Sequence, residues 1–320
     1  MPDTPHTPVP PAATPPPDET PIVWRGGLST RPRLLRIGAW LGSPAMLWLV
    51  VFFVLPALLL LAISFASRAP AGGIEWTFTL DNFKRLAGYG LFGWSPANGQ
   101  ILLRSLTIAT VSTVICVLLA YPLAFFIAAR PARTRMLWLI VLTVPFWTNL
   151  IVRTCAWLIL LGPESPLTRL SAALGFTEPG SALYPSTFAT LLGMISAYLP
   201  FVVMPLYGAV EKLNWNLIEA AQDLYGGRWR VFRHAILPQT YAALFVGVLL
   251  AFIPAMSTFL ISDILGGARF MLIGNLIQTQ FTFGSGNPPY AAAMALVLIL
   301  FTLVIIALFS RFGGKREDIA

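Results

Sequence analysis

Long runs without Asp, Glu, Lys or Arg alternate with short charged segments along the chain. An ionised side chain is costly in hydrocarbon, and a membrane-spanning helix needs roughly 20 apolar residues, so such runs predict membrane-spanning helices. The third run is short, but beyond Arg153 it continues through apolar residues to Leu161. The runs are 37–67, 105–129, 136–152, 179–210, 235–262 and 270–310. We therefore expect six helices, near 40–66, 105–129, 136–161, 187–210, 241–262 and 290–310.

The amino-acid composition supports this prediction. Hydrophobic residues make up 57% of the 320 residues and charged residues only 11%, whereas soluble domains carry roughly 25% charged residues. So few charges leave too little polar surface to cover a globule in water. The composition therefore excludes a soluble globular protein and indicates an all-α membrane protein.

The charged segments between the predicted helices indicate the orientation of the chain. Lys and Arg number 14 in the segments 1–36, 130–135, 211–234 and 311–320, but only 6 in the segments that face the other side. Because cytoplasmic loops carry an excess of Lys and Arg, both termini are expected in the cytoplasm. The net charge of +8 has the same origin, so it does not indicate nucleic-acid binding.

The beginning of the chain predicts a tail rather than a cleavable signal. A removable signal has an apolar core of about 7–15 residues near its start, but here nine prolines occur among the first 21 residues and the first apolar run begins near residue 37. Such a segment lacks the apolar residues to fold alone. We expect a disordered Pro-rich cytoplasmic tail at 1–36, a transmembrane domain at 37–312 with a long cytoplasmic loop at 211–240, and a short cytoplasmic tail at 313–320.

Side chains that support catalysis or metal binding are sparse. Cys116 and Cys155 each lie in an apolar run, and His6 and His234 are far apart. A disulfide framework, a metal site and a cluster of catalytic residues are therefore not expected. The predicted helices contain no Asp or Glu well inside them, which disfavours an ion-coupled secondary transporter. A channel is not excluded by these patterns.

Polar and aromatic residues beside helix prolines suggest a lined route through the bundle. Trp147 and Asn149 follow one such proline and Tyr198 precedes another, and the two aromatic residues are candidates for binding an ammonium group. Asp263, at the outer end of the fifth predicted helix, is a candidate carboxylate for a cation. Arg153 is the cation that lies deepest in a predicted helix. Either it forms a gate ion pair, or its long side chain extends to the membrane interface. The aromatic residues have the alternative roles of anchoring at the interface or packing. Asp263 has the alternative of a position at the membrane boundary without a binding role.

The long cytoplasmic loop has a helical pattern of its own. The pattern over 217–224 predicts a short helix, which Gly226 and Gly227 end because glycine adopts backbone angles that other residues avoid. A second, amphipathic helix is expected over Arg228–Ile236, with a stop at Pro238. Two helices that meet at a glycine turn below the bundle predict a compact knob that fits a socket on a soluble partner. The alternative is a solvated loop without a partner.

In this loop Glu219-Ala220-Ala221 is followed by a glycine seven positions after the Glu and then by Ile236-Leu237-Pro238. This pattern resembles the EAA loop of the permeases of binding-protein-dependent ABC importers, although Tyr225 stands where that family usually has glycine. The resemblance covers roughly 40–312 and is closest to the spermidine/putrescine permease branch, with Cys155 in place of a usual tyrosine. The segments similar to that branch are Pro145-Phe146-Trp147-Thr148, Arg153-Thr154-Cys155-Ala156-Trp157 and Leu199-Pro200-Phe201.

The resemblance implies a type I ABC importer-like permease fold in the bacterial inner membrane and a multi-pass subunit that imports polyamines such as spermidine and putrescine. Other small amines, aminophosphonates or amino-acid derivatives are alternative substrates. The implied partners are two ATP-binding subunits, a second permease subunit (homologous or identical), a periplasmic solute-binding protein and membrane lipid. The chain has no G-x-x-x-x-G-K-S/T pattern, so ATP and Mg are expected on the partner ATPase and no cofactor on this non-enzymatic chain. The residues implied to couple to the ATPase are Glu219, Ala220, Ala221, Asp223, Gly226, Gly227, Arg228 and Pro238.

Overall fold

The computed structural model describes residues 42–70, 73–90, 93–178, 180–267, 270–282 and 286–313. Internal contacts divide the chain into two units, Met1–Ala57 and Leu58–Ala320. Within the described residues, the first unit contains the beginning of the first long helix, and the second unit contains the other elements. The predicted tail 1–36, and all of the predicted tail 313–320 except Gly313, lie outside the described residues.

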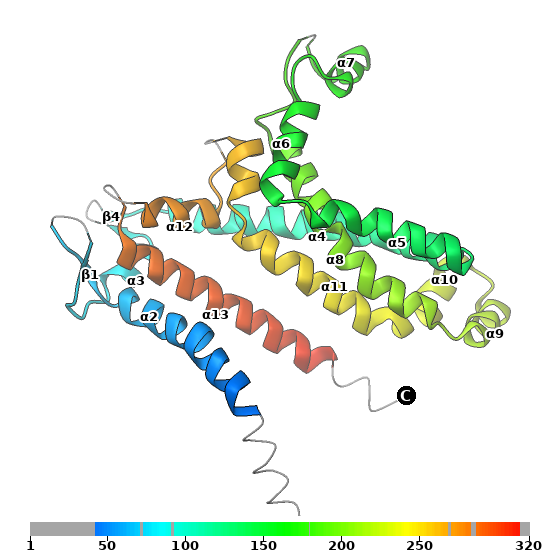
Figure 1. The fold of residues 1–320 in the computed structure, drawn as a ribbon, viewed down its shortest axis with the longest axis horizontal. Coiled ribbons are helices and arrows are strands. Elements are labelled where there is room, and N and C mark those ends of the chain that lie inside the picture. Colours follow the sequence, from blue (N-terminus) through cyan, green and yellow to red (C-terminus); the bar gives the residue numbers. More distant parts are fainter. Residues whose placement is uncertain are drawn as a thin grey trace, which may run out of the picture. The chain divides into compact units, whose positions relative to one another are not determined.

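Long apolar helices dominate the described chain (Figure 1). Five are long and apolar enough to cross a membrane, and one bent pair of helices is a further candidate. These candidates overlap the charge-free runs, so the prediction of a mostly helical membrane protein is confirmed. The five are Gly42–Ser64, which contains η1 (Val50–Val54) and α2 (Leu55–Ser64); α4 (Ala97–Ala128); α8 (Thr187–Glu211); the continuous helix of α10 (Arg228–Val231), η2 (Phe232–Ile236) and α11 (Leu237–Ser257); and Pro288–Ala307 within α13 (Pro288–Gly313). The bent pair is α5 (Ala132–Trp147) and α6 (Leu150–Leu160).

The bent pair corrects the prediction of one continuous helix over 136–161. α5 and α6 meet at an angle of 96°. Thr148 is extended, and Asn149 caps α6 because its side-chain oxygen accepts a hydrogen bond from the N–H of Ile151 at 2.8 Å. Asn is among the preferred N-cap residues. Two uncharged polar residues therefore start a new helix inside a run that hydrophobicity alone predicts to be continuous.

The prediction that the second loop helix stops at Pro238 is wrong, because α10, η2 and α11 form one helix. Proline lacks an N–H group and clashes with the carbonyl group four residues earlier in a regular α-helix. The π-helical turn η2, which ends two residues before Pro238, provides the wider backbone that accommodates it, and Pro238 itself is exposed. The fifth predicted helix is also too long at its other end, since α11 ends at Ser257 and Thr258 is extended with ψ of 135°.

The helices α4, α8 and α11 pack on one another and form the core of the second unit (Figure 1). Small side chains line their contacts: Ala120 and Ala124 of α4 and Ala251 of α11 are fully buried. Gly247 of α11 approaches α8 so closely that a Cβ atom there would lie 3.1 Å from the Cα of Val202. In a membrane, where van der Waals packing drives helix association, small residues allow this close approach of the backbones.

Short elements gather at both ends of this core (Figure 1). Two antiparallel hairpins, α3 and α12 lie at one end, and α9 lies beside α10 at the other. The hairpins pair Ser67 with Glu75 and Tyr89 with Trp94. The bounds are β1 (Ser67–Arg68), β2 (Ile74–Glu75), α3 (Asp81–Leu86), β3 (Tyr89–Gly90), β4 (Gly93–Trp94), α7 (Pro166–Ala173), α9 (Trp215–Tyr225), η3 (Ser262–Gly266) and α12 (Ile273–Phe281).

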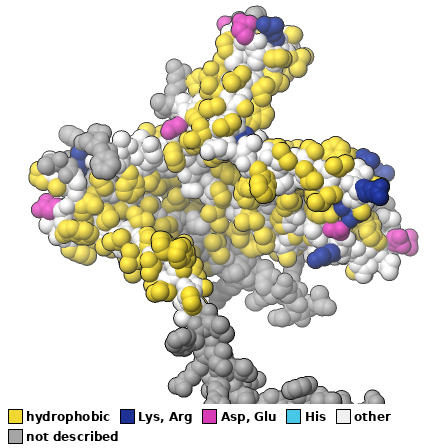
Figure 2. All heavy atoms as spheres, viewed as in Figure 1, with side chains coloured by type: hydrophobic (Ala, Val, Ile, Leu, Met, Phe, Trp, Pro, Cys, Tyr) yellow, Lys and Arg dark blue, Asp and Glu magenta, His cyan; other side chains and the backbone are white. Residues whose placement is uncertain are grey.

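The surface of the helices is strongly apolar. Figure 2 shows a largely hydrophobic face, with Lys and Arg gathered at the end where α5 begins and α9 lies. On α5, Leu137, Val141 and Val144 are 61%, 61% and 56% exposed. Contiguous apolar surface on this scale is unfavourable in water, so this face suits contact with lipid or with another membrane protein.

Candidate functional site

Polar side chains fix the helix α9 to the bundle. Asn214 caps α9, because its side-chain oxygen accepts a hydrogen bond from the N–H of Asn216 at 3.1 Å. The N–H of Asn214 donates to Oε1 of Gln239 at 2.9 Å, and Nε2 of Gln239 donates to the carbonyl of Ala235 at 2.9 Å. The start of α9 is therefore tied to the helix that begins with α10 and continues into α11.

The helix α9 has a packed face and an outward face. Ile218 and Ala221, one turn apart, are 3% and 7% exposed and belong to the core. Glu219, Ala220 and Asp223 are exposed. Within the described residues Glu219 forms no ion pair. The helix α9 therefore forms the first part of the expected knob, and the carboxylate on its outward face has no ion pair among the residues that the structure describes.

The turn after α9 shows which of the two glycines ends the helix. Gly226 has left-handed backbone angles of φ 63° and ψ −17°, and its N–H donates to the carbonyl of Gln222 at 2.9 Å. Gly227 is extended at φ −111° and ψ 130°, and the exposed Arg228 begins α10. Left-handed angles favour glycine because other residues bring Cβ too close to the backbone. Gly226 is the residue that this turn requires, and Tyr225 remains part of α9.

Replacing Gly226 by Ala is expected to loosen this turn. The left-handed conformation costs an alanine about 1–2 kcal/mol, and no neighbouring atom lies within 4 Å of the added Cβ, so strain of the backbone is the main effect. Opening of the turn is then expected to become about 5–30 times more frequent. Limited proteolysis between α9 and α10 measures this opening. Gly227→Ala is the matched control, and equal cleavage of the two variants would contradict the assignment.

Aromatic rings connect the second part of the loop to α4. Phe232 packs edge-on against Tyr121 of α4, with 5.2 Å between ring centroids, and it stacks on Trp229 at 5.6 Å. The hydroxyl groups of Tyr121 and Thr240 lie within hydrogen-bonding distance at 3.0 Å. Ile236 packs against the core, whereas Trp229 is 71% exposed. Of the apolar residues in the predicted amphipathic helix, Phe232 and Ile236 therefore face the bundle and Trp229 extends beyond it.

Arg153 lies at the break between α5 and α6. Its Nη2 donates to the carbonyl groups of Thr148 at 3.2 Å and Phe146 at 3.4 Å, and its guanidinium carbon lies 5.9 Å from the centre of the Phe146 ring. The last carbonyl groups of a helix lack partners and form the negative end of its dipole. Arg153 therefore stabilises the end of α5. It forms no ion pair within the described part of the chain, so a gate ion pair stays a prediction.

Groups from α8 and α11 lie close to this break. Phe201 of α8 meets Phe146 edge-on at 4.8 Å. Tyr198 is 7% exposed, donates a hydrogen bond of 3.4 Å to the carbonyl of Pro254 in α11, and lies close enough to Arg153 for an electrostatic interaction. The structure thus brings together two of the predicted pathway residues, Arg153 and Tyr198, at the point where the third candidate span bends.

Trp147 and Asn149 occupy the connection between α5 and α6. The side chain of Trp147 is 86% exposed. The side-chain oxygen of Asn149 is engaged as the cap of α6. Within this chain, Trp147 is therefore free to contact lipid or another subunit, and Asn149 acts in shaping the bend.

The sequence predicts Asp263 at the outer end of the fifth helix. That helix, α11, ends at Ser257, and Asp263 lies beyond it in η3. Its Oδ1 accepts a hydrogen bond from Nδ2 of Asn275 at 2.5 Å, and the same nitrogen donates to the carbonyl of Phe259 at 3.1 Å. Oδ1 of Asn275 accepts from the N–H of Leu272 at 3.1 Å. Asn275 is 3% exposed, so this buried amide fixes the exposed Asp263. Asn275 is not among the site residues predicted from the sequence above.

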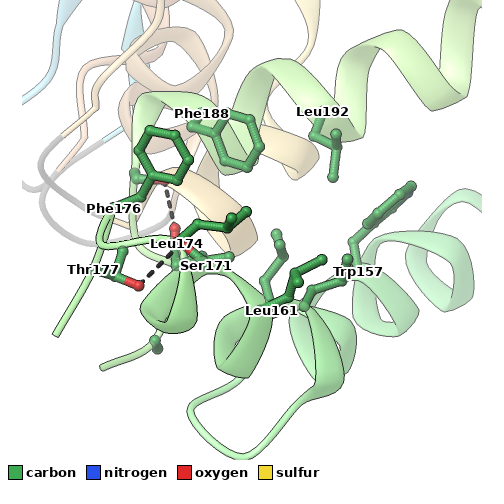
Figure 3. A pocket seen from close by; sticks show the side chains of 13 residues that line it. Trp157, Leu161, Ser171, Leu174, Phe176, Thr177, Phe188 and Leu192 are labelled. Atoms are coloured by element: carbon green, nitrogen blue, oxygen red, sulfur yellow. Dashed lines mark hydrogen bonds between the residues drawn. The ribbon is translucent and has the colours of Figure 1, made fainter. Parts of the chain in front are cut away.

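A groove of about 760 Å³ lies between α6, α7 and the start of α8 (Figure 3). Trp157, Leu161, Leu174 and Phe188 line it, and its few polar groups include Ser171. An apolar lining cannot replace the water around a charged molecule. The groove therefore suits a lipid chain or an apolar helix rather than a cationic solute.

The loop, the apolar helices and the sequence motifs agree with a family that most of the chain matches. Residues 120–316 match the family described as "Binding-protein-dependent transport system inner membrane component". This match covers more than half of the chain, and the chain belongs to this family of transporter permeases.

Relatives and solved structures extend this finding. The chain is 36% identical over 275 residues to the spermidine/putrescine transport system permease protein PotB of Escherichia coli, which covers 85% of this chain and 97% of the relative. It is 33% identical over 264 residues to PotB of Haemophilus influenzae, covering 82% and 90%. A crystal structure of a bacterial alginate ABC transporter, with its periplasmic protein bound to an alginate pentasaccharide, contains a chain with a TM-score of 0.65 and 16% identity, covering 91% of this chain and 98% of that chain. That likeness concerns the fold alone.

Proposed function

We propose that this chain is a transmembrane permease subunit of an ATP-driven ABC importer that moves polyamines into the bacterial cytoplasm. The observation that carries the proposal is the knob formed by α9, the left-handed Gly226 and α10, on which Glu219 is exposed and has no ion pair to the described residues. The similarity to permeases named for spermidine and putrescine supports the substrate class. Another small amine, an aminophosphonate or an amino-acid derivative is the alternative substrate.

The proposed arrangement has six spans in the inner membrane, with α5 and α6 counted as one and both termini in the cytoplasm. Cations support this orientation. Arg130 lies in the turn between α4 and α5 and Arg133 in the first turn of α5, while Lys212 lies in the connection to α9 and Arg230 in α10. Cytoplasmic segments are rich in Lys and Arg. The knob then faces the cytoplasm, and the end with the hairpins and α12 faces the periplasm.

We propose that two ATP-binding subunits bind the outward faces of this knob and of the equivalent knob on a second permease subunit, and that they alone hold ATP and Mg. A periplasmic solute-binding protein delivers the substrate at the other end. Glu219 provides the ionic anchor, Ala220 and Asp223 extend its face, and Ala221 lets α9 pack closely. Arg228 and Pro238 lie exposed at the rim of the knob. Closure of the ATP-binding subunits moves the knobs, and the bundle changes the side on which it opens.

The proposed substrate route passes the bend between α5 and α6. Aromatic faces and carboxylates attract ammonium groups, which suits Tyr198, Trp147 and the fixed carboxylate of Asp263. Arg153 is a cation and repels the substrate, so we assign to it and to Asn149 the shaping of the bend rather than direct binding. The carboxylate of Asp263 and the buried amide of Asn275 would form the first polar contact on the periplasmic side.

Uptake by the reconstituted complex tests this function. Proteoliposomes that contain this chain, a second permease subunit and the ATP-binding subunits, with the binding protein added outside, are expected to import radiolabelled spermidine or putrescine only when ATP is enclosed. Uptake of a different amine with ATP would support the alternative substrate. Uptake driven by a proton or sodium gradient without ATP would contradict the importer mechanism.

A further inference from the structure

Arg135, in the first turn of α5, binds acceptors at the ends of two other helices. Its Nη1 forms an ion pair with Oε1 of Glu211, the last residue of α8. Its Nη2 donates to the carbonyl of Ala128, the last residue of α4, at 3.2 Å, and its Nε donates to the carbonyl of Arg130 at 3.4 Å. One guanidinium group therefore joins α4, α5 and α8 at the end of the bundle where α9 lies (Figure 1).

The chemistry of this contact requires an arginine. The carbonyl of Ala128 is among the last four of α4, which have no partner within the helix. A guanidinium group offers several N–H donors in a rigid planar fork, so it binds a carboxylate and two carbonyl groups at once. A lysine keeps the charge but concentrates it at one point and lacks this fork.

This ion pair differs from the exposed pair of Arg169 and Glu164. The side chains of Arg135 and Glu211 are 26% and 42% exposed, whereas those of the pair Arg169–Glu164 are 71% and 85% exposed. Arg135 and Glu211 are 76 residues apart in sequence, and Arg169 and Glu164 only 5. The pair of Arg135 therefore links separate helices, while the exposed pair lies within one local segment.

The position of Glu211 places this link beside the knob. Residues 212–214 alone separate it from α9, and within them Leu213 is 6% exposed and Asn214 is bound to Gln239. Such a short and fixed connection cannot absorb a movement of α9, so the movement reaches Glu211 directly. At its other end α5 leads to Phe146, which contacts Phe201 at the bend.

We propose that the ion pair of Arg135 and Glu211 is the joint that transmits a movement of α9 to α4 and α5. The inference rests on the proposed function as an ABC importer permease. Arg135 is a positioning residue, because it acts through Glu211 and the end of α4 rather than on the substrate. Without the joint, α9 moves while α4 and α5 lag behind, and ATP is hydrolysed without import.

The ratio of imported spermidine to hydrolysed ATP tests the joint. Both quantities are measured on the same proteoliposomes of the complete complex with its binding protein. The ratio is expected to fall at least about fivefold in Arg135→Gln and in Glu211→Gln, with no further fall in the double variant because the two residues act as a unit. Arg135→Lys is expected to recover part of the ratio. Arg169→Gln, which breaks the exposed pair with Glu164, is the matched control and is expected to keep the native ratio.

A native ratio in Arg135→Gln would overturn the inference, even if that variant unfolds at a lower temperature, because the pair would then only add stability. A fall in the double variant equal to the product of the two single falls would overturn it as well. If the native complex neither hydrolyses ATP nor imports spermidine, the proposed function fails instead. The two failures are therefore distinguishable.

Discussion

Replacing Glu219 by Lys is expected to reduce ATP-driven uptake by at least about tenfold while the permease stays folded and inserted. The carboxylate is exposed on the outward face of α9 and has no ion pair within the described residues, so its loss breaks no ion pair among them. Exposed substitutions of this kind change stability by less than about 0.5 kcal/mol. Bringing like charges together across an interface costs several kcal/mol, and about 1.4 kcal/mol already corresponds to tenfold.

The measurement compares ATP hydrolysis and uptake of the native and Glu219→Lys complexes in nanodiscs and proteoliposomes, with and without loaded binding protein. Glu75→Lys is the matched control for ATP hydrolysis without binding protein, because it makes the same charge change on strand β2 at the opposite end of the second unit, away from α9. Glu219→Gln, which removes the charge without reversing it, is expected to fall between the two. Native uptake by Glu219→Lys would refute the docking role of α9.

Much of this fold could be predicted from charge and hydrophobicity, because a lipid environment makes these the dominant local constraints. The fourth predicted helix, 187–210, differs from α8 by one residue, since charged or turn-forming residues mark both of its ends. The knob could also be predicted. Its turn needs backbone angles that glycine tolerates and few other residues do, and Gly226 stands there; Ile218 and Ala221, one turn apart, form the buried face of α9. In these places the local sequence determines the local structure.

The remaining features depend on contacts between distant segments or on small polar residues. Asn149 starts a new helix within an uncharged run, and the π-helical turn before Pro238 keeps a helix continuous where a proline predicts a stop. The bond between Asn275 and Asp263 forms because α12 packs beside the end of α11. A hydropathy pattern contains no information on such pairings, so these parts of the candidate site could not be predicted.

Replacing Gly274 by Ala is expected to disrupt the packing of α12 at the proposed periplasmic end. Gly274 lies in α12 against the end of α11, where an added Cβ would lie 2.4 Å from the carbonyl oxygen of Ser257 and 2.8 Å from that of Thr258. Backbone oxygens cannot rotate away as side-chain atoms do, so α12 must shift as a whole. Overpacking of this kind costs about 1–3 kcal/mol.

The shift also reaches the candidate substrate route, because Asn275 is the next residue and its amide fixes Asp263. Gly274→Ala is therefore expected to lower the unfolding temperature of the purified permease and to weaken spermidine uptake together. Gly208→Ala, in α8 with no atom within 4 Å of the added Cβ, is the matched control. It is expected to be neutral or to stabilise the helix by up to about 1 kcal/mol. If the two variants unfold at the same temperature, α12 does not pack on α11 as described, and the support of Asp263 by Asn275 is refuted with it.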